Sequence, residues 1–110
     1  MAKKPKGNPI DGWLALDKPQ GLTSSEAMNR VKRALNPRKI GHGGTLDPLA
    51  SGLLPIAMGE ATKTVAYVMD GVKTYRFTVR WGVGTDTCDA EGETVAESDR
   101  RPAEAEIADA

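Results

Sequence analysis

The sequence predicts one small domain built from both helices and strands, of the α/β or α+β class. Three observations support this fold class: short apolar runs bounded by turn residues, two segments with apolar residues at helical spacing, and one segment with strict apolar–polar alternation. The chain has 110 residues, a length that suits one domain able to bury about two thirds of its unfolded surface.

The first predicted strand is the apolar run at residues 13–16, which precedes the turn Asp17-Lys18-Pro19. Residues 23–26 match a capping box, and apolar residues follow at helical spacing. The pattern therefore predicts a helix that Asn36-Pro37 ends. The polar side of this helix carries three cations, Arg30, Lys32 and Arg33.

Further elements follow in the second half of the chain. Residues 53–57 are expected to form a short strand or an edge segment, because Pro55 lacks the N–H that a sheet partner needs. A second amphipathic helix is predicted over residues 61–69. Alternation over residues 74–81 predicts a half-buried strand, residues 82–92 read as a turn-rich loop, and helix-forming residues follow Pro102.

A glycine-rich loop around a single carboxylate is the most informative part of the chain. Glycines at 41, 43, 44 and 52 surround Asp47, and glycine permits backbone conformations and close approaches that other residues forbid. Pro48 disfavours helical backbone at Asp47, so the acid is expected on an extended or turning segment. An Asp before Pro is also a common turn former, and without further context that interpretation comes first.

Residues 41–52, with Leu54-Pro55-Ile56 and residues 59–63, closely resemble the catalytic motif of the TruB family. Members of this family are tRNA pseudouridine-55 synthases. The resemblance extends upstream to residues 17–24 and downstream to Tyr75 and residues 84–87, in the family's order, and covers roughly residues 11–98. So many specified positions make this signal far more specific than a short motif.

The resemblance implies the pseudouridine synthase fold, an α+β fold with a mixed, mostly antiparallel sheet flanked by helices. We expect residues 1–10 to be a basic, flexible tail and residues 11–110 to be the N-terminal part of the catalytic domain. Family members are longer, and the arginine that pairs with their catalytic aspartate would lie beyond residue 110. Residues 1–110 alone are therefore expected to be inactive.

The resemblance also assigns roles to individual residues. Asp47 matches the catalytic aspartate, and a cation is expected beside it to keep it ionised. His42 would hold the rearranged RNA loop, and Tyr75 would stack on the flipped uracil. The substrate-binding residues that it implies are His42, Gly43, Gly44, Lys18 and Tyr75.

Each of these roles has a plainer alternative. His42 could be an exposed loop histidine that titrates near neutrality. Tyr75 lies on the same side of its predicted strand as Phe77, so core packing is the ordinary interpretation. Lys18 could be an exposed lysine on a turn, or the turn could bring it near the loop that carries Asp47.

The formal net charge of zero conceals an uneven distribution. Residues 1–40 contain nine Lys or Arg and three acids (9 − 3 = +6), whereas residues 86–110 contain two and nine (2 − 9 = −7). A basic N-terminal part suits phosphate backbones, so Arg38 and Lys39 are expected to contact RNA phosphates, although an exposed basic pair is the competing interpretation. The partner implied is the T-arm stem-loop of tRNA.

Other site classes find little support in the sequence. One cysteine and one histidine provide neither a disulfide framework nor a zinc site, and Asp86 and Asp89 lack EF-hand spacing, so no metal is expected. Nucleotide-cofactor fingerprints, a membrane span and a secretion signal are absent from the sequence. A cytoplasmic protein without a cofactor is expected, monomeric at full length.

The predicted function is isomerisation of uridine-55 in the tRNA T-loop to pseudouridine, with Asp47 as the catalytic residue. The alternative is a non-catalytic RNA-binding module that uses the basic helix and loop. His42-Gly43-Gly44 also resembles the oxyanion loop of esterases, but the chain has no Gly-x-Ser-x-Gly motif and no second histidine to act as the base.

Overall fold

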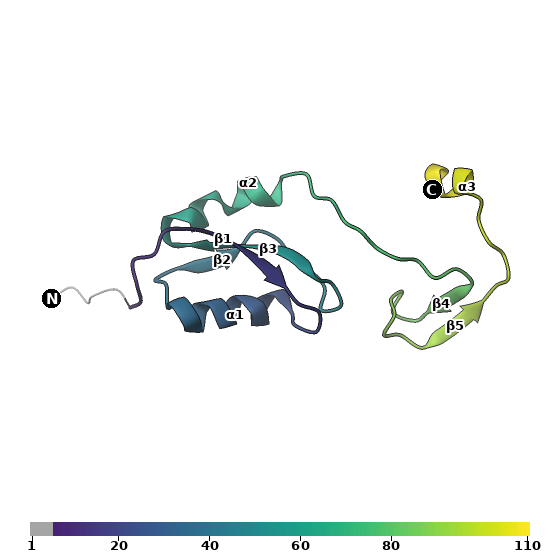
Figure 1. Ribbon diagram of the computed structural model, residues 1–110, viewed down its shortest axis with the longest axis horizontal. Helices are drawn as coiled ribbons and strands as arrows, with labels where there is room; N and C mark the ends of the chain where they lie inside the picture. Colours follow the sequence, from purple (N-terminus) through teal and green to yellow (C-terminus); the bar gives the residue numbers. More distant parts are fainter. Residues whose placement is uncertain (1–5) are drawn as a thin grey trace. The chain divides into compact units, whose positions relative to one another are not determined.

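The computed structural model describes residues 6–110, which form two units, one ending at Lys73 and the other comprising Thr74–Ala110 (Figure 1). Each unit has its own sheet, and both sheets are antiparallel. The first unit contains β1 (Gly12–Lys18), α1 (Ser24–Leu35), β2 (Ile40–His42), β3 (Gly52–Met58), the 3-10 helix η1 (Gly59–Thr64) and α2 (Val65–Met69). The second contains β4 (Val83–Thr85), β5 (Thr94–Glu97) and α3 (Glu104–Asp109).

The sheet of the first unit has the strand order β1-β3-β2, so β3 is its central strand. β1 pairs with β3 along its whole length, from Gly12 opposite Met58 to Lys18 opposite Gly52. β2 pairs with β3 from Ile40 opposite Met58 to His42 opposite Ile56, the residue that follows Pro55. The predicted strand at 53–57 is confirmed. It is paired on both sides at Ile56 and Ala57, where the edge-segment alternative is wrong, whereas residues 53–55 are paired with β1 alone.

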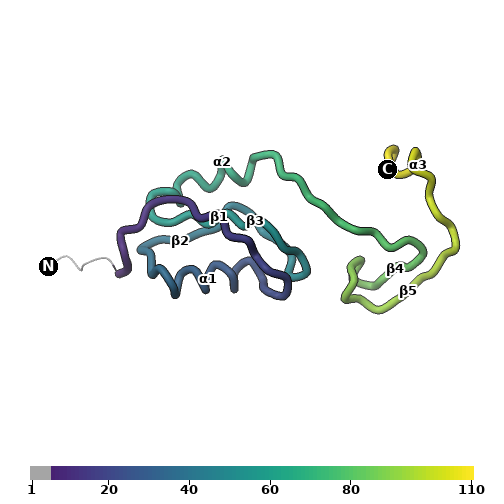
Figure 2. Tube along the Cα trace, in the orientation of Figure 1, coloured from purple at the N-terminus to yellow at the C-terminus, as the bar shows by residue number. Residues whose placement is uncertain are grey.

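The core of the first unit lies between β3 and α1. Its buried apolar residues are Ala27 and Val31 from the helix and Leu54, Ile56 and Met58 from the strand. In the view of Figures 1 and 2, the sheet lies between α1 and the segment formed by η1 and α2. The central strand therefore faces α1 with its apolar side chains and carries the loop with Asp47 at its N-terminal end.

The ends of α1 agree with the sequence prediction. Thr23 is the N-cap, and its hydroxyl accepts a hydrogen bond from the backbone N–H of Glu26 at 3.0 Å. Asn36 ends the helix in the left-handed conformation, with φ of 46°, and donates its N–H to the carbonyl of Lys32. The predicted helix over these residues is confirmed.

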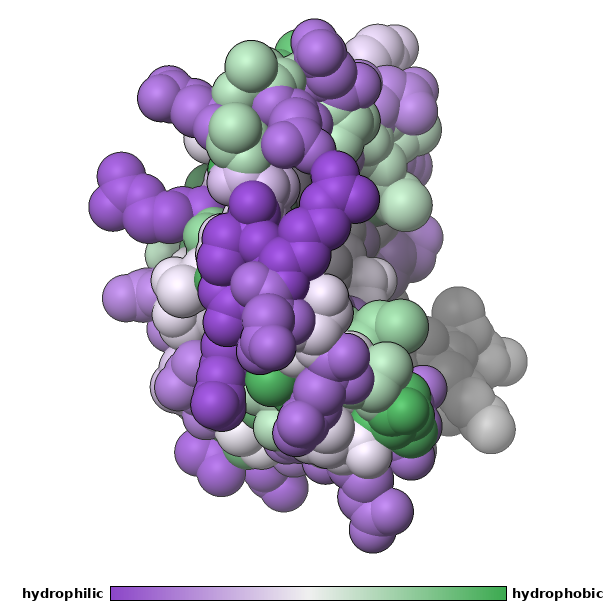
Figure 3. Space-filling model, turned by 90° about the vertical axis from the view of Figure 1, so that its right-hand side faces the viewer, coloured by the Kyte–Doolittle hydropathy of each residue, from purple (hydrophilic) through white to green (hydrophobic). Residues whose placement is uncertain are grey.

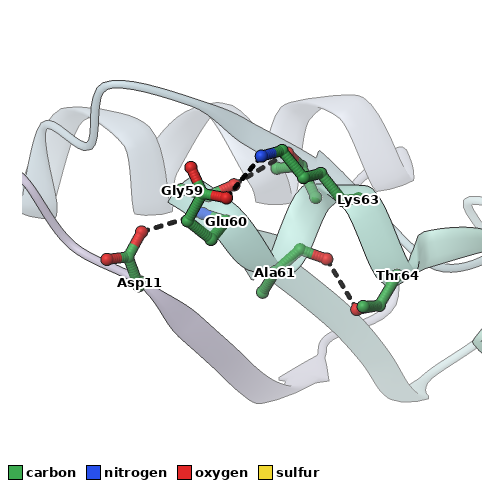
Figure 4. Close-up of polar contacts among 7 residues, drawn as sticks. Asp11, Gly59, Glu60, Ala61, Lys63 and Thr64 are labelled. Carbon is green, nitrogen blue, oxygen red and sulfur yellow. Dashed lines mark hydrogen bonds and ion pairs between the residues drawn. The ribbon is translucent and has the colours of Figure 1, made fainter.

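The predicted helix at 61–69 begins instead as a 3-10 helix. The hydroxyls of Thr62 and Thr64 each donate to the carbonyl three residues earlier, at 2.7 Å. Such side-chain bonds compete with the regular helical ladder. The backbone N–H of Glu60 donates to the Asp11 carboxylate at 2.8 Å, which fixes the start of η1 against the segment before β1 (Figure 4).

Figure 4 also shows the ion pair that Glu60 forms with Lys63 at 2.5 Å. The hydrogen bond and the negative charge of Glu60 raise the pKa of Lys63 above its ordinary value. Gly59, at φ of 60°, lies so close to Asp11 and Ile10 that a β-carbon there would overlap both residues.

The segment before β1 is attached to the end of α1. The Asn8 side chain donates to the carbonyl of Leu35 at 2.8 Å, and its backbone pairs with Asn36 and Arg38. Residues 1–5 of the predicted flexible tail lie outside the described residues. Asn8 belongs to the part of the predicted tail that the structure describes, and its hydrogen bonds attach this part to the domain.

The second unit contains a hairpin where the sequence predicted only a loop. Val83–Thr85 forms β4, which pairs with β5 across an irregularity between Gly84 and Thr85, so the loop prediction for 82–92 is wrong at its start. The connecting turn is held by Asp89, whose carboxylate accepts from the Thr87 hydroxyl and the Glu91 N–H. Both hydrogen bonds lower the pKa of Asp89, and the one from Thr87 has the larger effect. The helix predicted after Pro102 is confirmed as α3.

The half-buried strand predicted over residues 74–81 does not form. Residues 73–80 have no regular secondary structure, and Tyr75 and Phe77 are 62% and 79% exposed. A strand exists only as part of a ladder, and no segment of residues 6–110 pairs with this one.

The face in Figure 3 is mostly hydrophilic, with separate hydrophobic areas among the polar side chains.

Candidate functional site

The loop between β2 and β3 presents Asp47 to solvent. Asp47 is exposed, and its carbonyl accepts a hydrogen bond from the N–H of Ala50 at 2.9 Å, which closes a turn directly after the acid. Of the glycines expected to shape this loop, Gly52 adopts positive φ (127°), whereas the others do not. The loop therefore holds its carboxylate on a turning backbone, as the sequence predicted.

Two contacts attach this loop to the segment Gly21–Ser24, which leads into α1 and includes its first residue. The Ser24 hydroxyl donates to the carbonyl of Leu46 at 3.0 Å and accepts from its N–H at 2.8 Å. On the other side of the acid, the carbonyl of Pro48 accepts from the N–H of Gly21 at 2.7 Å. The residues before and after Asp47 are thus both fixed to one structural element.

Sequence reasoning missed the contribution of Ser24, which it treated only as part of a capping box. Ser24 is 3% exposed and lies 22 residues from its partner Leu46. The sequence offers one partial signal, because Thr23 already supplies the cap and leaves the next hydroxyl free for another partner.

Lys18, an implied substrate-binding residue, is fully buried at the end of β1. Its ammonium donates to the carbonyls of Pro19 at 2.9 Å and Leu22 at 2.7 Å. The alternative of an exposed lysine is wrong. The turn predicted at residues 17–19 begins later than expected, because Asp17 and Lys18 end β1 and the turn lies at Gln20-Gly21. The Lys18 ammonium binds the carbonyls of the residues that flank this turn. A direct contact between Lys18 and substrate stays a prediction.

His42, Gly43 and Gly44 follow one another at the end of β2. Gly43 is buried and donates its N–H to the carbonyl of Pro55 at 2.9 Å. A β-carbon on Gly43 would lie 2.8 Å from a methyl carbon of Val68, so helix α2 packs directly against this glycine. Nδ1 of His42 is a buried nitrogen without a hydrogen-bond partner in residues 6–110.

Arg38 and Lys39 are exposed and directly precede β2. The Lys39 carbonyl accepts from the N–H of Gly59 at 3.0 Å, and the N–H of Arg38 donates to the carbonyl of Asn8 at 3.1 Å. The backbone of this basic pair is therefore held in place. Both side chains are exposed, and Nε of Arg38 also donates to the carbonyl of Gly7 at 3.4 Å. The three cations on the polar side of α1, Arg30, Lys32 and Arg33, are also exposed.

Tyr75 belongs to the second unit, whereas Asp47 belongs to the first. Tyr75 is 62% exposed, so the residues described do not form a core around it. Its stacking role stays a prediction.

The cation expected beside Asp47 is not found within residues 6–110. The ion pairs of this part of the chain join Lys63 to Glu60 and Arg100 to Glu106, and neither involves Asp47. The described residues also contain no group of three or more His, Cys, Asp or Glu side chains that could bind a metal. No helix among them is both long and apolar enough to span a membrane.

Residues 32–110 match the family model described as TruB family pseudouridylate synthase (N terminal domain). The tRNA pseudouridine synthase B of Gluconacetobacter diazotrophicus is 62% identical over 100 residues, which are 91% of this chain and 33% of that protein. The enzyme of the same name from Agrobacterium fabrum is 61% identical over 107 residues, 97% of this chain and 34% of its own length.

A solved structure supports the same assignment. The chain aligns at a TM-score of 0.50 and 40% identity with a protein in "Structure of H/ACA RNP bound to a substrate RNA containing 2'-deoxyuridine", covering 61% of this chain and 24% of that one. The expected α+β fold, part of a pseudouridine synthase domain, is therefore confirmed. The chain spans about a third of the length of the curated relatives cited above. With the family model matching most of its residues, this chain belongs to the TruB family of pseudouridylate synthases.

Proposed function

We propose that the full-length protein that carries residues 1–110 isomerises uridine-55 in the T-loop of tRNA to pseudouridine, with Asp47 as the catalytic residue. The proposal depends on one observation: in a chain of the TruB family, the loop that carries Asp47 is held in place on both sides of this acid. Its exposed carboxylate lies between two hydrogen-bonded residues: Leu46, which is bonded to Ser24 at the start of α1, and Pro48, which is bonded to Gly21 before it. Reactive groups gain most when their position is fixed before substrate arrives.

The reaction breaks the bond between N1 of uracil and C1′ of ribose, turns the base, and joins C5 to C1′, while C5 loses its proton and N1 gains one. An ionised carboxylate can assist in three ways: it can attack the sugar, attack the base or remove the proton. The exposure of Asp47 suits each of these roles, because the target base must leave its stack to reach the acid. Because this is an isomerisation, substrate and product contain the same atoms, and the reaction requires no second substrate.

RNA binding in this proposal depends on two exposed cations, Arg38 and Lys39. Arg38 and Lys39 directly precede the strand that leads to His42, and phosphate contacts of this kind position RNA without reading its sequence. His42 ends β2 and is half-buried, so part of its side chain is open to the proposed contact with the rearranged T-loop. Gly43, Gly44, Lys18 and Tyr75 complete the proposed substrate-binding set.

The test is chemical mapping of pseudouridine in a tRNA transcript and in an isolated T-arm stem-loop, each incubated with the full-length protein. We expect modification at uridine-55 in both RNAs and none in a transcript with cytidine at that position. RNA binding without modification would instead support the alternative of a non-catalytic RNA-binding module. Modification at a different uridine would refute the proposed substrate site.

The protein is proposed to act in the cytoplasm, as a monomer and without a cofactor. Size-exclusion chromatography with light scattering on the full-length protein tests the oligomeric state.

A further inference from the structure

One hydroxyl group, that of Ser24, makes two hydrogen bonds to the residue that precedes the proposed catalytic acid. We infer that Ser24 is a positioning residue, which fixes the direction in which Asp47 leaves the backbone. This inference rests on the proposed function of Asp47 and adds a residue to which the sequence assigned no role in the site.

Both peptide groups that flank Asp47 are held in place. The peptide between Leu46 and Asp47 is fixed through its carbonyl, which accepts from the Ser24 hydroxyl at 3.0 Å. The peptide between Asp47 and Pro48 is fixed through the Asp47 carbonyl, which accepts from Ala50 at 2.9 Å. Since two fixed peptide planes determine where the β-carbon points, only the side-chain torsions of Asp47 remain free.

The other end of this connection is anchored in the core. Ser24 is the first residue of α1, and the same helix contributes Ala27 and Val31 to the buried cluster. Leu46 also packs against that cluster with its own side chain. The position of the loop is therefore set by a helix that is itself held by the central strand β3.

Ser24 is free for this role because its neighbour caps the helix. The Thr23 hydroxyl accepts from the N–H of Glu26 at 3.0 Å, so the Ser24 hydroxyl is not needed at the helix N-terminus. The two adjacent hydroxyls thus separate two functions: one stabilises α1, and the other holds the loop of Asp47. This separation supplies a matched control.

The experiment compares Ser24→Ala, Thr23→Ala and Ser25→Ala in the full-length protein. Three quantities are measured for each variant: the single-turnover rate of pseudouridine formation at saturating tRNA, the Kd for tRNA, and the thermal unfolding midpoint. Ser25 is exposed and is the second residue of α1, so its variant reports on any general effect of changing the start of this helix.

We expect Ser24→Ala to lower the single-turnover rate by about 10²-fold, as a misplaced reacting group does, with the Kd unchanged. Thr23→Ala should lower the unfolding midpoint while keeping the wild-type rate, and Ser25→Ala should change neither quantity. Ser24→Thr keeps the hydroxyl and is expected to restore most of the rate.

A wild-type rate in Ser24→Ala would overturn the inference, as would an equal loss of rate in Thr23→Ala. If Ser24→Ala does not fold, Ser24→Cys takes its place, because it keeps the size of the side chain and weakens the hydrogen bonds; a wild-type rate in Ser24→Cys would overturn the inference equally. An inactive wild-type protein would refute the proposed function itself, which distinguishes the two failures.

Discussion

Gly43→Ala tests how helix α2 supports the loop of the proposed active site. Gly43 is buried and does not adopt positive φ, so the backbone itself would accept alanine. The conflict is steric, because the new β-carbon would lie 2.8 Å and 3.2 Å from two carbons of the Val68 side chain. Overpacking of this kind costs about 1–3 kcal/mol.

At about 2–4 °C per kcal/mol, the unfolding midpoint of Gly43→Ala should fall by about 2–12 °C. Val68→Ala removes the opposing methyl groups, so the double variant should be more stable than the sum of the two single changes, by about 0.5–3 kcal/mol. Gly41→Ala is the matched control, because a β-carbon there meets nothing within 4 Å. It should stay within about 0.5 kcal/mol of the wild type.

The assay is thermal unfolding of the full-length protein and its four variants, followed by circular dichroism. If Gly43→Ala is as stable as Gly41→Ala, or if Val68→Ala fails to offset the loss in Gly43→Ala, then steric contact with α2 does not explain the glycine.

Three further predictions concern other parts of the chain. Asp11→Ala removes the acceptor of the Glu60 N–H and should destabilise the protein by about 0.5–1.5 kcal/mol, whereas Asp11→Asn should lose less; equal unfolding midpoints for both would contradict this. The pKa of Asp89 is lowered, so its contribution to the hairpin is complete above the unfolded pKa and is lost as the pH falls through the folded one. The amide chemical shift of Glu91 should therefore be constant from about pH 7 to pH 5 and move only in more acidic solution, and a transition near neutrality would show that Asp89 does not hold this turn. Tyr75→Phe should keep most of the activity, and Tyr75→Leu should lose about 1–3 kcal/mol of stacking energy in the tRNA complex; if Leu lowers only the unfolding midpoint, Tyr75 is a packing residue.

Elements with local signals could be predicted from the sequence. The helix at Ser24–Leu35 is marked by a cap, an apolar face and a terminating Asn-Pro pair, and all three signals act within a few residues. The strand predicted at 74–81 has equally clear alternation, but a strand also needs a neighbour, and alternation contains no information about one. The hairpin of β4 and β5 was missed because β4 is short and contains Gly84.

In the candidate site, too, features with a local signal could be predicted, whereas contacts between distant residues could not. The composition of the loop and its resemblance to a family identified Asp47, which the structure places on an exposed turn. The contact of Ser24 with Leu46 and that of Gly43 with Val68 join residues far apart in the sequence. Such contacts depend on how α1 and α2 pack against the sheet, and packing of this kind cannot be inferred from local patterns.

The most direct test of the account measures the chemical step and tRNA binding separately for Asp47→Asn. Its loop is held through backbone groups, so this substitution removes the charge and leaves the hydrogen bonds of Ser24, Gly21 and Ala50 in place. Release of tritium from C5 of labelled uridine in tRNA reports the reaction under single-turnover conditions, and filter binding reports the Kd. Asp70→Asn, at the exposed end of α2, is the matched control.

We expect Asp47→Asn to slow tritium release by about 10²–10⁴-fold or more, whereas the Kd for tRNA stays at the wild-type value because phosphate contacts dominate binding. Asp70→Asn should match the wild type in both measurements. Release at a near wild-type rate by Asp47→Asn would show that this carboxylate does not perform the chemistry and would contradict the central claim.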